Sequence, residues 1–294
     1  MNKDTSWRHH YIPQFYLNGF LSSNNTFKIY DVEKCHFIKN GMDVYPRSYF
    51  FEKGGNTLSN EEGSSDIIES NYAKLETKVS DIFNRINSNS VINKFGINDY
   101  DIAALQHFVG MMYWRNPTNY EEIKDIIKSK TLRNLGLILK DKSGSSIEDD
   151  EIENRIKENH NFFTIMKFWF AMVSYPETIS CNTPLHIISL QPGLPSVCSD
   201  NPIICKNPDT FRVYTDDFIL PLNNTKLFIR GELSQLCMTS VKVEIDCLIF
   251  KQARKYVSCT DERYINMLNE LYENNYRDLN ELRMSIFRQV FKKS

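Results

Sequence analysis

The hydrophobic period of this chain changes near residue 184, and this change constrains the fold more than any other feature. Before it, apolar residues recur every three or four positions, as they do along one face of an amphipathic helix. The clearest stripe lies within residues 65–87 and consists of Ile68, Tyr72, Leu75, Val79, Ile82 and Ile86. After it, short apolar runs alternate with turn residues, which is typical of antiparallel strands. A helical first part followed by strands favours an α+β fold packed as one unit.

The same patterns predict where the other elements lie. Residues 26–39 alternate on both sides of residues 32–34, as a β-hairpin does. Helices are predicted over residues 65–87, 98–114, 120–139, 149–174, 240–257, 262–274 and 278–291. Strands are predicted over residues 185–190, 196–198, 211–214, 218–220 and 226–229. We therefore expect a mostly helical α+β fold with an N-terminal β-hairpin and a small antiparallel sheet in the C-terminal half.

Length and composition indicate one globular unit. The 294 residues are 41% apolar and 24% charged, and we assign residues 1–294 to a single domain with a loop or insertion at residues 141–150. The formal net charge of −2 lacks the basic excess of a dedicated nucleic-acid binder, although balanced charges still allow a local basic groove. The seven cysteines form no CxxC pair, which fits reduced thiols in a cytoplasmic protein. Because residues 1–10 lack the apolar core of a secretory signal and no apolar run is long enough to span a membrane, we expect no membrane partner.

The pair His9-His10 is the densest group of reactive side chains. Imidazole titrates near neutral pH and suits a metal ligand or a general base, and the residues alone do not choose between this role and a packed histidine. Because neighbouring residues of an extended segment point to opposite faces, one histidine is expected to face a site while the other makes a structural hydrogen bond. Pro13 can begin a short helix whose apolar face anchors the segment in the core. That face consists of Tyr16, Leu17 and Phe20.

Charged residues on two predicted helices have a structural and a functional interpretation. Glu69 and Glu76 lie two turns apart on one helix face, where such charges are more often solvated than functional. Glu76 follows the core position Leu75, so partial burial is expected. Arg115 ends a helix before Pro117, where it either interacts with the helix dipole or holds a phosphate or carboxylate with its planar guanidinium.

Residues 199–202, Ser-Asp-Asn-Pro, follow a predicted strand. Asp and Asn readily bond their own backbone, so a structural turn is one interpretation. The other, of equal weight, is that the Asp200 carboxylate projects from the strand end into a cleft as a metal ligand or base. The chain has no P-loop, GxGxxG, HExxH or GxSxG motif, which disfavours nucleotide-fold enzymes, zincins and α/β-hydrolases.

Six segments in this order resemble landmarks of DUF4238, a bacterial family of uncharacterised proteins. HHYIPQFYLNGF is similar to its N-terminal signature, IIESNYAKLETKVSDIFNRI to its glutamate-bearing helix, and YWRNP to its Arg-x-Pro segment. VCSDNPII resembles its SDNP turn, ILPLNNTKLFI its Pro-Leu strand, and EIDCLIFKQARKYVSC a helix that usually carries Asn where this chain has Asp246. This departure weakens Asp246 as a site residue. By resemblance, the site residues are His9, His10, Pro13, Tyr16, Leu17, Phe20, Glu76, Arg115, Pro117, Ser199, Asp200, Asn201 and Pro202.

Carboxylates, imidazoles and a guanidinium together suit a metal-dependent phosphodiesterase, which we expect to be a nuclease acting on DNA, RNA or tRNA. Glu76 and Asp200 are the expected ligands of Mg²⁺ or Mn²⁺, His9 or His10 the ligand or general base, and Arg115 the group that holds the phosphate. Pro13, Tyr16, Ser199, Asn201 and Pro202 are expected to support this site. The resemblance adds an expected role as a bacterial toxin or anti-phage defence effector.

Two other functions use the same residues. In a non-enzymatic sensor or interaction module, which would bind a partner protein or a second copy, the histidines and the SDNP turn are structural. A nucleotide-modifying transferase would use the same cleft without bound metal. The nuclease hypothesis requires His10, Glu76, Arg115 and Asp200 to lie around one cleft, with the histidines docked against the turn at Asp200.

Overall fold

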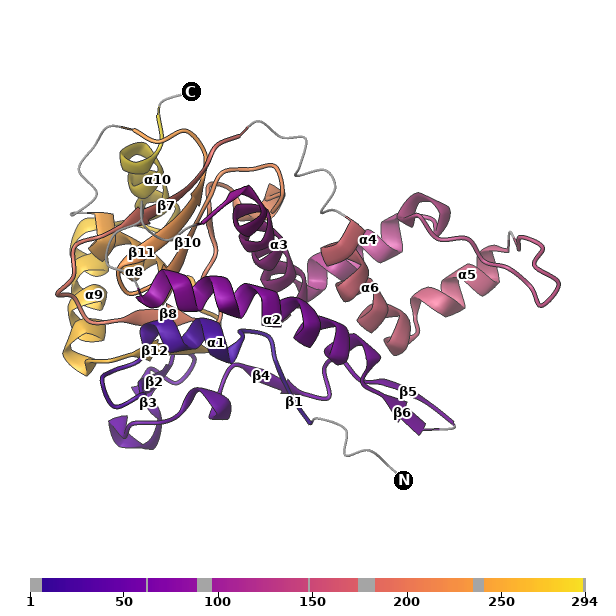
Figure 1. Cartoon of the computed structure of the whole chain (residues 1–294), viewed down its shortest axis with the longest axis horizontal. Coiled ribbons are helices and arrows are strands. Elements are labelled where there is room, and N and C mark those ends of the chain that lie inside the picture. The colour runs from indigo at the N-terminus through magenta and orange to yellow at the C-terminus, as the bar shows by residue number, and fades with distance from the viewer. Residues whose placement is uncertain are drawn as a thin grey trace.

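The structure, a computed structural model, describes residues 7–61, 63–88, 97–147, 149–173, 183–234 and 241–292. Helices and antiparallel strands share one fold of the α+β class (Figure 1). The helices are α1 (Gln14–Leu17), α2 (Ile67–Ser88), α3 (Asp99–Arg115), α4 (Tyr120–Ser129), α5 (Asp150–Lys157), α6 (His160–Val173), α8 (Val241–Lys251), α9 (Glu262–Asn275) and α10 (Leu279–Val290). The strands are β1 (Arg8–His10), β2 (Lys28–Asp31), β3 (His36–Phe37), β4 (Phe51–Lys53), β5 (Leu58–Asn60), β6 (Gly63–Ser65), β7 (Leu185–Ser189), β8 (Val197–Ser199), β9 (Ile204–Cys205), β10 (Phe218–Asn223), β11 (Lys226–Arg230) and β12 (Tyr256–Cys259).

The strands form two four-stranded antiparallel sheets and two short ribbons. One sheet has the order β7-β11-β10-β9 and uses only the later part of the chain. The other has the order β3-β2-β12-β8, so the early pair β2–β3 is completed by strands from the far end of the sequence. The ribbons are β1–β4 and β5–β6. The hairpin over residues 26–39 is therefore the edge of a larger sheet rather than a separate unit.

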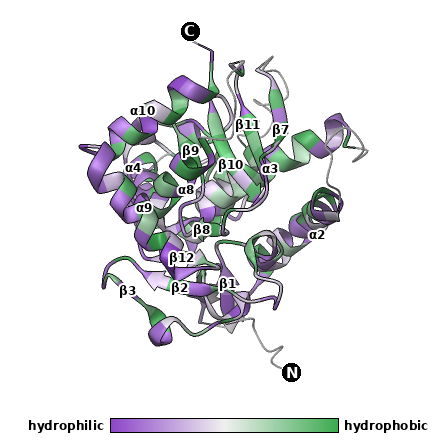
Figure 2. Cartoon of the chain, turned by 90° about the vertical axis from the view of Figure 1, so that its left-hand side faces the viewer, coloured by the Kyte–Doolittle hydropathy of each residue, from purple (hydrophilic) through white to green (hydrophobic). Residues whose placement is uncertain are grey.

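Strands β10 and β11 are buried along their whole length. Alternate residues enter two different apolar clusters: Phe218 and Phe228 pack with α1, α2 and α3, whereas Ile219 and Ile229 pack with α8, α9 and α10. Figure 2 shows these apolar strands between the two helical layers. A sheet covered on both faces explains why its strands read as continuous apolar runs instead of alternating with polar residues.

The N-terminal segment is anchored as its pattern predicts. Tyr16 and Leu17 are fully buried on α1, and Phe20 follows in the adjoining 3-10 turn. The Tyr16 hydroxyl donates to the carbonyl oxygen of Pro221 in β10, at 2.7 Å. Gly19 packs so closely that a Cβ atom there would lie 2.8 Å from that of Asn223. The anchor therefore docks on β10.

Two predicted helices are shorter or divided. The helix predicted over residues 149–174 is divided into α5 and α6, because the Asn159 side chain accepts a hydrogen bond from the Asn161 N–H and starts a new helix. The helix predicted over residues 120–139 ends at Ser129. Shortly after it, the Leu132 N–H donates to the Glu153 carboxylate, a contact 21 residues away that local propensity does not anticipate.

Two further predictions are wrong. Residues 256–259 form strand β12, not the end of a helix over 240–257, because α8 stops at Lys251. Residues 211–214 form no strand; Phe211 and Tyr214 are buried in the core, and the Tyr214 hydroxyl donates to the Ala171 carbonyl oxygen at 2.8 Å. The loop expected at residues 141–150 is closed by an isolated bridge between Lys140 and Ser146. Over the described ranges, none of the helices has the length and apolar character needed to cross a bilayer.

Candidate functional site

The two histidines lie on β1, which pairs with β4 in a three-residue ribbon. His9 is opposite Glu52, and His10 is opposite Phe51. Because side chains alternate along a strand, His9 and Glu52 share the face that points into the protein, and His10 lies on the other face with Phe51. The ring centroids of His10 and Phe51 are 5.6 Å apart. The pair thus divides between two environments.

Hydrogen bonds fix the tautomer of each neutral histidine. His9 is 2% exposed, and its Nδ1 accepts the backbone N–H of Asn56 at 2.9 Å, so its proton lies on Nε2. His10 bonds the backbone of Pro46, which has no N–H, so His10 donates to the carbonyl oxygen and keeps a lone pair on Nε2. Burial, followed by the nearby Arg115 charge, lowers the pKa of His10 to about 4. His9 is therefore a donor and His10 a neutral acceptor near neutral pH.

Arg115 is a buried charge at the end of α3. Its Nη1 bonds the Glu76 carboxylate of α2 at 2.6 Å, and its Nε donates to the Tyr11 carbonyl oxygen at 3.1 Å. The guanidinium carbon lies 5.2 Å from the ring centroid of Tyr72. Arg115 thus joins α2 to the residue after the histidine pair. His10, Glu76 and Arg115, three of the four residues that the nuclease hypothesis requires around one cleft, therefore lie in one region.

A second chain of contacts links His9 to α2, the helix that carries Glu76. The residue that donates to His9, Asn56, also donates through Nδ2 to Glu69 at 2.8 Å. Glu69 and Arg115 both act on the buried Tyr72 hydroxyl, whose pKa is raised above its ordinary value chiefly by burial. We call the connected side chains the Arg115 network; they are His9, Asn56, Glu69, Tyr72, Glu76 and Arg115.

The network contains polar atoms with unused hydrogen-bonding capacity. Within the described ranges, three of its buried atoms have no hydrogen-bond partner: His9 Nε2, the Tyr72 hydroxyl and Arg115 Nη2. His10 Nε2, near the Arg115 charge, is a fourth. Buried polar groups normally find partners, and exceptions often mark a functional position. Three potential donors in one network, one of them on the guanidinium itself, suit a negatively charged ligand.

A branch that the sequence did not single out extends from this network towards the surface. Lys167 of α6 donates to the Gly55 carbonyl oxygen at 2.7 Å and to the Tyr120 hydroxyl at 3.0 Å, and that hydroxyl bonds Glu52. Burial lowers the pKa of Lys167 to about 8, partly against the nearby Glu52 charge. The sequence signal is a lone charge within the apolar run over residues 162–173, which by itself predicts only a buried helix.

Asp200 directly follows β8 and has a structural role. Its Oδ1 accepts the backbone N–H of Arg254 at 2.9 Å, and its Oδ2 accepts those of Lys255 and Tyr256 at 2.7 and 3.0 Å. Burial raises the pKa of Asp200, while these three donors act in the opposite direction. The carboxylate therefore fixes the start of β12, which explains why the chain cannot continue there as a helix.

The other residues of the SDNP turn make structural bonds as well. The hydroxyl oxygen of Ser199 accepts the Asn201 N–H, and Asn201 exchanges hydrogen bonds with Gln252. Pro202 is buried. The turn meets the Arg115 segment through one contact, because Asn116 Nδ2 donates to the Asp200 carbonyl oxygen at 2.6 Å. The histidines thus connect to the turn only indirectly, through residues 11, 115 and 116.

A small cleft of about 360 Å³ lies beside the network. Glu52, Tyr11 and Asn116, which contact the network or its branch, line one side of it. Arg254 and Lys255 line the other side, next to Asp200. Of the four residues that the nuclease hypothesis requires around one cleft, only Asp200 is among these lining residues, whereas His10, Glu76 and Arg115 lie beside the cleft in or near the network. Its volume is within the range of small-ligand sites. The backbone at its edge is strained, since Phe50 has a φ of +60°, an outlier for a bulky residue.

The two carboxylates predicted to bind metal are both engaged by protein groups. Glu76 bonds Arg115, and Asp200 bonds three backbone N–H groups. In the part of the chain that the structure describes, no three His, Cys, Asp or Glu side chains gather closely enough to hold a metal ion. The donor set of Glu76 and Asp200 therefore does not fit a shared ion in this arrangement.

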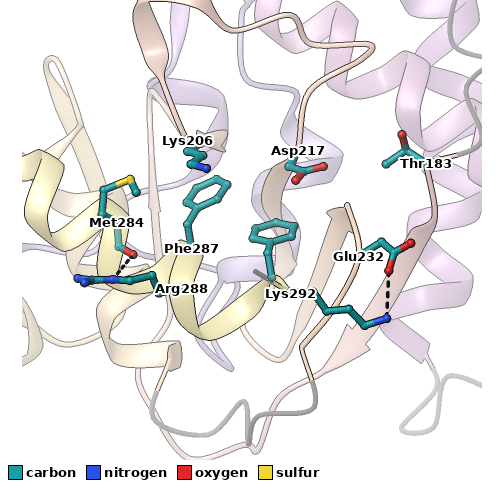
Figure 3. Close-up of a pocket in the computed structure, with 9 residues that line it drawn as sticks. Thr183, Lys206, Asp217, Glu232, Met284, Phe287, Arg288 and Lys292 are labelled. Carbon is teal, nitrogen blue, oxygen red and sulfur yellow. Dashed lines mark hydrogen bonds and ion pairs between the residues drawn. The ribbon is translucent and has the colours of Figure 1, made fainter. Parts of the chain in front are cut away.

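A larger hollow, of about 510 Å³, lies in the C-terminal half between α10 and the loops around β9–β11 (Figure 3). Some of its side chains pair with each other: Lys292 pairs with Glu232 at 3.0 Å, and the rings of Phe287 and Phe291 stack 4.8 Å apart. None of the predicted site residues lines it. The cleft beside the Arg115 network is the better candidate site.

Comparison with known proteins gives a family but no activity. Neither a curated protein nor a solved structure matches the chain. A family model does match: DUF4238, whose description is 'protein of unknown function'. The match covers residues 8–272, which include β1, the Arg115 network and the cleft. The chain therefore belongs to the DUF4238 family.

Proposed function

We propose that this chain is a phosphodiesterase, and specifically a nuclease, that holds a phosphate at the Arg115 network. The observation that carries the proposal is the guanidinium of Arg115, which is 2% exposed and keeps Nη2 without a protein partner in the described structure. Burying a charged donor is costly unless it is bonded. A phosphate oxygen is a fitting acceptor, because arginine binds phosphate with its planar set of N–H groups.

The neighbouring donors support the same ligand. Tyr72, whose ring centroid lies 5.2 Å from the guanidinium carbon, adds a hydroxyl, and the N–H on His9 Nε2 is a further donor of the network. Fixed donors in a site shielded from water stabilise charge that develops on phosphoryl oxygens. These groups would therefore bind the phosphate more tightly in the transition state than in the ground state.

His10 is the proposed general base. It is neutral near neutral pH, and Nε2 keeps the lone pair that accepts a proton. As the oxygen of water bonds to phosphorus, His10 takes the proton of that water. The bond from phosphorus to the leaving oxygen then breaks, and this oxygen takes a proton from solvent. His9 and His10 lie on opposite faces of β1, so their roles are separable by mutation.

A divalent ion shared by Glu76 and Asp200 does not fit the arrangement described above, so no step of the proposal uses one. Binding of Mg²⁺ or Mn²⁺ there would require Glu76 to leave Arg115 and Asp200 to leave the start of β12. We therefore assign phosphate binding and proton transfer to Arg115, His9 and His10. The metal arm of the experiment below tests the ion by itself.

The experiment measures cleavage of bis(p-nitrophenyl) phosphate, single-stranded DNA, RNA and tRNA with Mg²⁺, with Mn²⁺ and with EDTA. Arg115→Gln and His10→Gln should lower the rate about 100-fold or more, as loss of a charge-stabilising donor does. The exposed Arg277, which pairs with Glu281, gives the matched control Arg277→Gln. Equal cleavage by folded wild type and Arg115→Gln would reject the assignment. Loss of activity in EDTA that Mg²⁺ restores would support the ion.

The alternative is a non-enzymatic sensor or interaction module. Engagement of both Glu76 and Asp200 by protein groups favours it, since structural staples need no further ligand. A toxin or anti-phage role fits either function. Arg115→Gln should abolish growth arrest or phage resistance if cleavage causes the effect, and should leave it intact if binding alone does.

A further inference from the structure

Two exposed aromatic rings at or near the β1–β4 ribbon each have a cationic side chain beside them. Trp7 is 63% exposed and Tyr45 is 56% exposed. The Lys53 ammonium lies 4.9 Å from the Trp7 ring centroid, and the Arg47 guanidinium lies 5.7 Å from that of Tyr45. Large exposed apolar groups are typical of interaction sites, and here a positive charge accompanies each one.

The same pairing continues towards the cleft. The Arg8 guanidinium lies 5.1 Å from the ring of Phe51, which lines the cleft. On the far side of the cleft, Lys255 lies 5.1 Å from the ring of Tyr256. Tyr49 packs edge-on against Tyr256, with ring centroids 5.6 Å apart. The cleft mouth is therefore framed by aromatic rings and cations.

These pairs form one continuous surface. Arg8 and Lys53 are partners in the β1–β4 register, and Arg8 also donates to the Arg47 carbonyl oxygen at 3.3 Å. Phe51 joins the ribbon to the cleft. Figure 1 shows β1 and β4 close together near the N-terminal end of the described chain. We call this the aromatic–basic surface; it comprises Trp7, Arg8, Tyr45, Arg47, Tyr49, Phe51, Lys53, Arg254, Lys255 and Tyr256.

Charge along this surface is positive although the whole chain carries −2. Its cations are Arg8, Arg47, Lys53, Arg254 and Lys255. The acids that line the cleft are Glu33, Glu52 and Asp200. Glu52 already accepts a bond from Tyr120, and Asp200 bonds the backbone. The basic balance is therefore local, and the overall composition conceals it.

We infer that the aromatic–basic surface binds single-stranded nucleic acid and leads it into the cleft. Bases stack on aromatic rings whatever their sequence, while cations follow the phosphates. A duplex would hide the base faces that Trp7, Tyr45 and Tyr49 can contact. The inference rests on the proposed function in naming its substrate, but the binding itself requires no cleavage.

The experiment measures fluorescence anisotropy of labelled single-stranded DNA and RNA of about 12 nucleotides, with EDTA present. Trp7→Ala should weaken binding at least about fivefold, since one base stack is lost. The triple variant Arg8→Gln/Arg47→Gln/Lys53→Gln should weaken it at least tenfold and reduce the slope of log K against log salt by about 2. The control Arg263→Gln/Arg277→Gln removes two exposed cations on α9 and before α10, and should bind as wild type does.

Equal weakening by the control and the triple variant would overturn the inference, as would equal affinity for a duplex of the same length or for anionic lipid vesicles. Binding without any cleavage would support this surface and reject the nuclease proposal. Cleavage of bis(p-nitrophenyl) phosphate without oligonucleotide binding would support the phosphodiesterase proposal and reject this surface as a nucleic-acid site. Quenching of Trp7 fluorescence by an oligonucleotide, absent in Trp7→Phe, gives a readout that a loss of folding does not imitate.

Discussion

The sharpest prediction concerns Asp200, where a metal ligand and a structural staple differ in their consequences. Asp200→Asn keeps the size of the side chain but turns one oxygen into an NH₂ group that faces backbone N–H donors. Each hydrogen bond to a charged group contributes about 1.5–3 kcal/mol net. Three such bonds hold the start of β12, and two of the donors belong to exposed residues that water can partly reach. We expect a loss of about 2–4 kcal/mol for Asn and about 3–5 kcal/mol for Ala.

The assay is urea unfolding followed by tryptophan fluorescence, together with a thermal melt. A loss of about 3 kcal/mol should lower the melting temperature by about 6–12 °C in a chain of this size. The matched control is Asp209→Asn, because Asp209 lies on the same stretch of chain but is exposed. The control should stay within about 0.5 kcal/mol of wild type.

The reasoning would be refuted by an Asp200→Asn variant that is as stable as wild type but has lost binding of Mg²⁺ or Mn²⁺ in calorimetry. That outcome would show that the Asp200 carboxylate binds metal and that its hydrogen bonds to the backbone do not contribute to stability. A destabilised variant whose metal response is unchanged would instead establish the staple.

Three other predictions follow from the buried contacts. In a double-mutant cycle of Arg115→Met and Glu76→Gln, urea unfolding should give a coupling energy of about 1–3 kcal/mol, and additive effects would contradict the ion pair. Because burial lowers the pKa of His10 to about 4, its stabilising contribution is fully present above about pH 6.5 and is lost as the pH falls towards 4. Relative to His10→Gln, wild type should lose about 1–2 kcal/mol of unfolding free energy over that window after allowance for solvent screening, and parallel pH profiles would rule this out. Tyr16→Phe should cost about 1–2 kcal/mol by leaving the Pro221 carbonyl oxygen unpaired, and an unchanged melting temperature would show that water replaces the hydroxyl.

Much of the fold is predictable because local patterns and tertiary packing agree. The stripe on α2 and the cap at Asn98, whose side chain accepts the Asp101 N–H, define helices that the structure contains within a few residues. Prediction fails where a group far away in the sequence determines the local backbone conformation. The end of α8 is one such place, because the Asp200 carboxylate captures the next N–H groups from about 55 residues away.

The candidate site was predictable in its residue types but only partly in its arrangement. The nuclease hypothesis expects Arg115 and Glu76 around one site as phosphate-binding residue and metal ligand, but it does not predict their ion pair, in which the two side chains lie 2.6 Å apart. Lys167 and Tyr120 were missed because a charge within an apolar helix and a tyrosine after a proline have ordinary structural roles. Their contact exists because α4 packs against α6, an arrangement that no local pattern records.

The sheet order β3-β2-β12-β8 has a consequence for how the protein is made. During synthesis, strand β2 cannot pair with β12 until about 225 further residues have been added to the chain. At roughly 5–20 residues per second, synthesis leaves this strand without its partner for about 10–45 s. Docking of α1 is delayed in the same way, because its hydrogen-bond partner on β10 lies about 205 residues later in the chain. A ribosome-bound fragment that ends before residue 256 should therefore expose apolar surface around Ile29 that the finished fold buries.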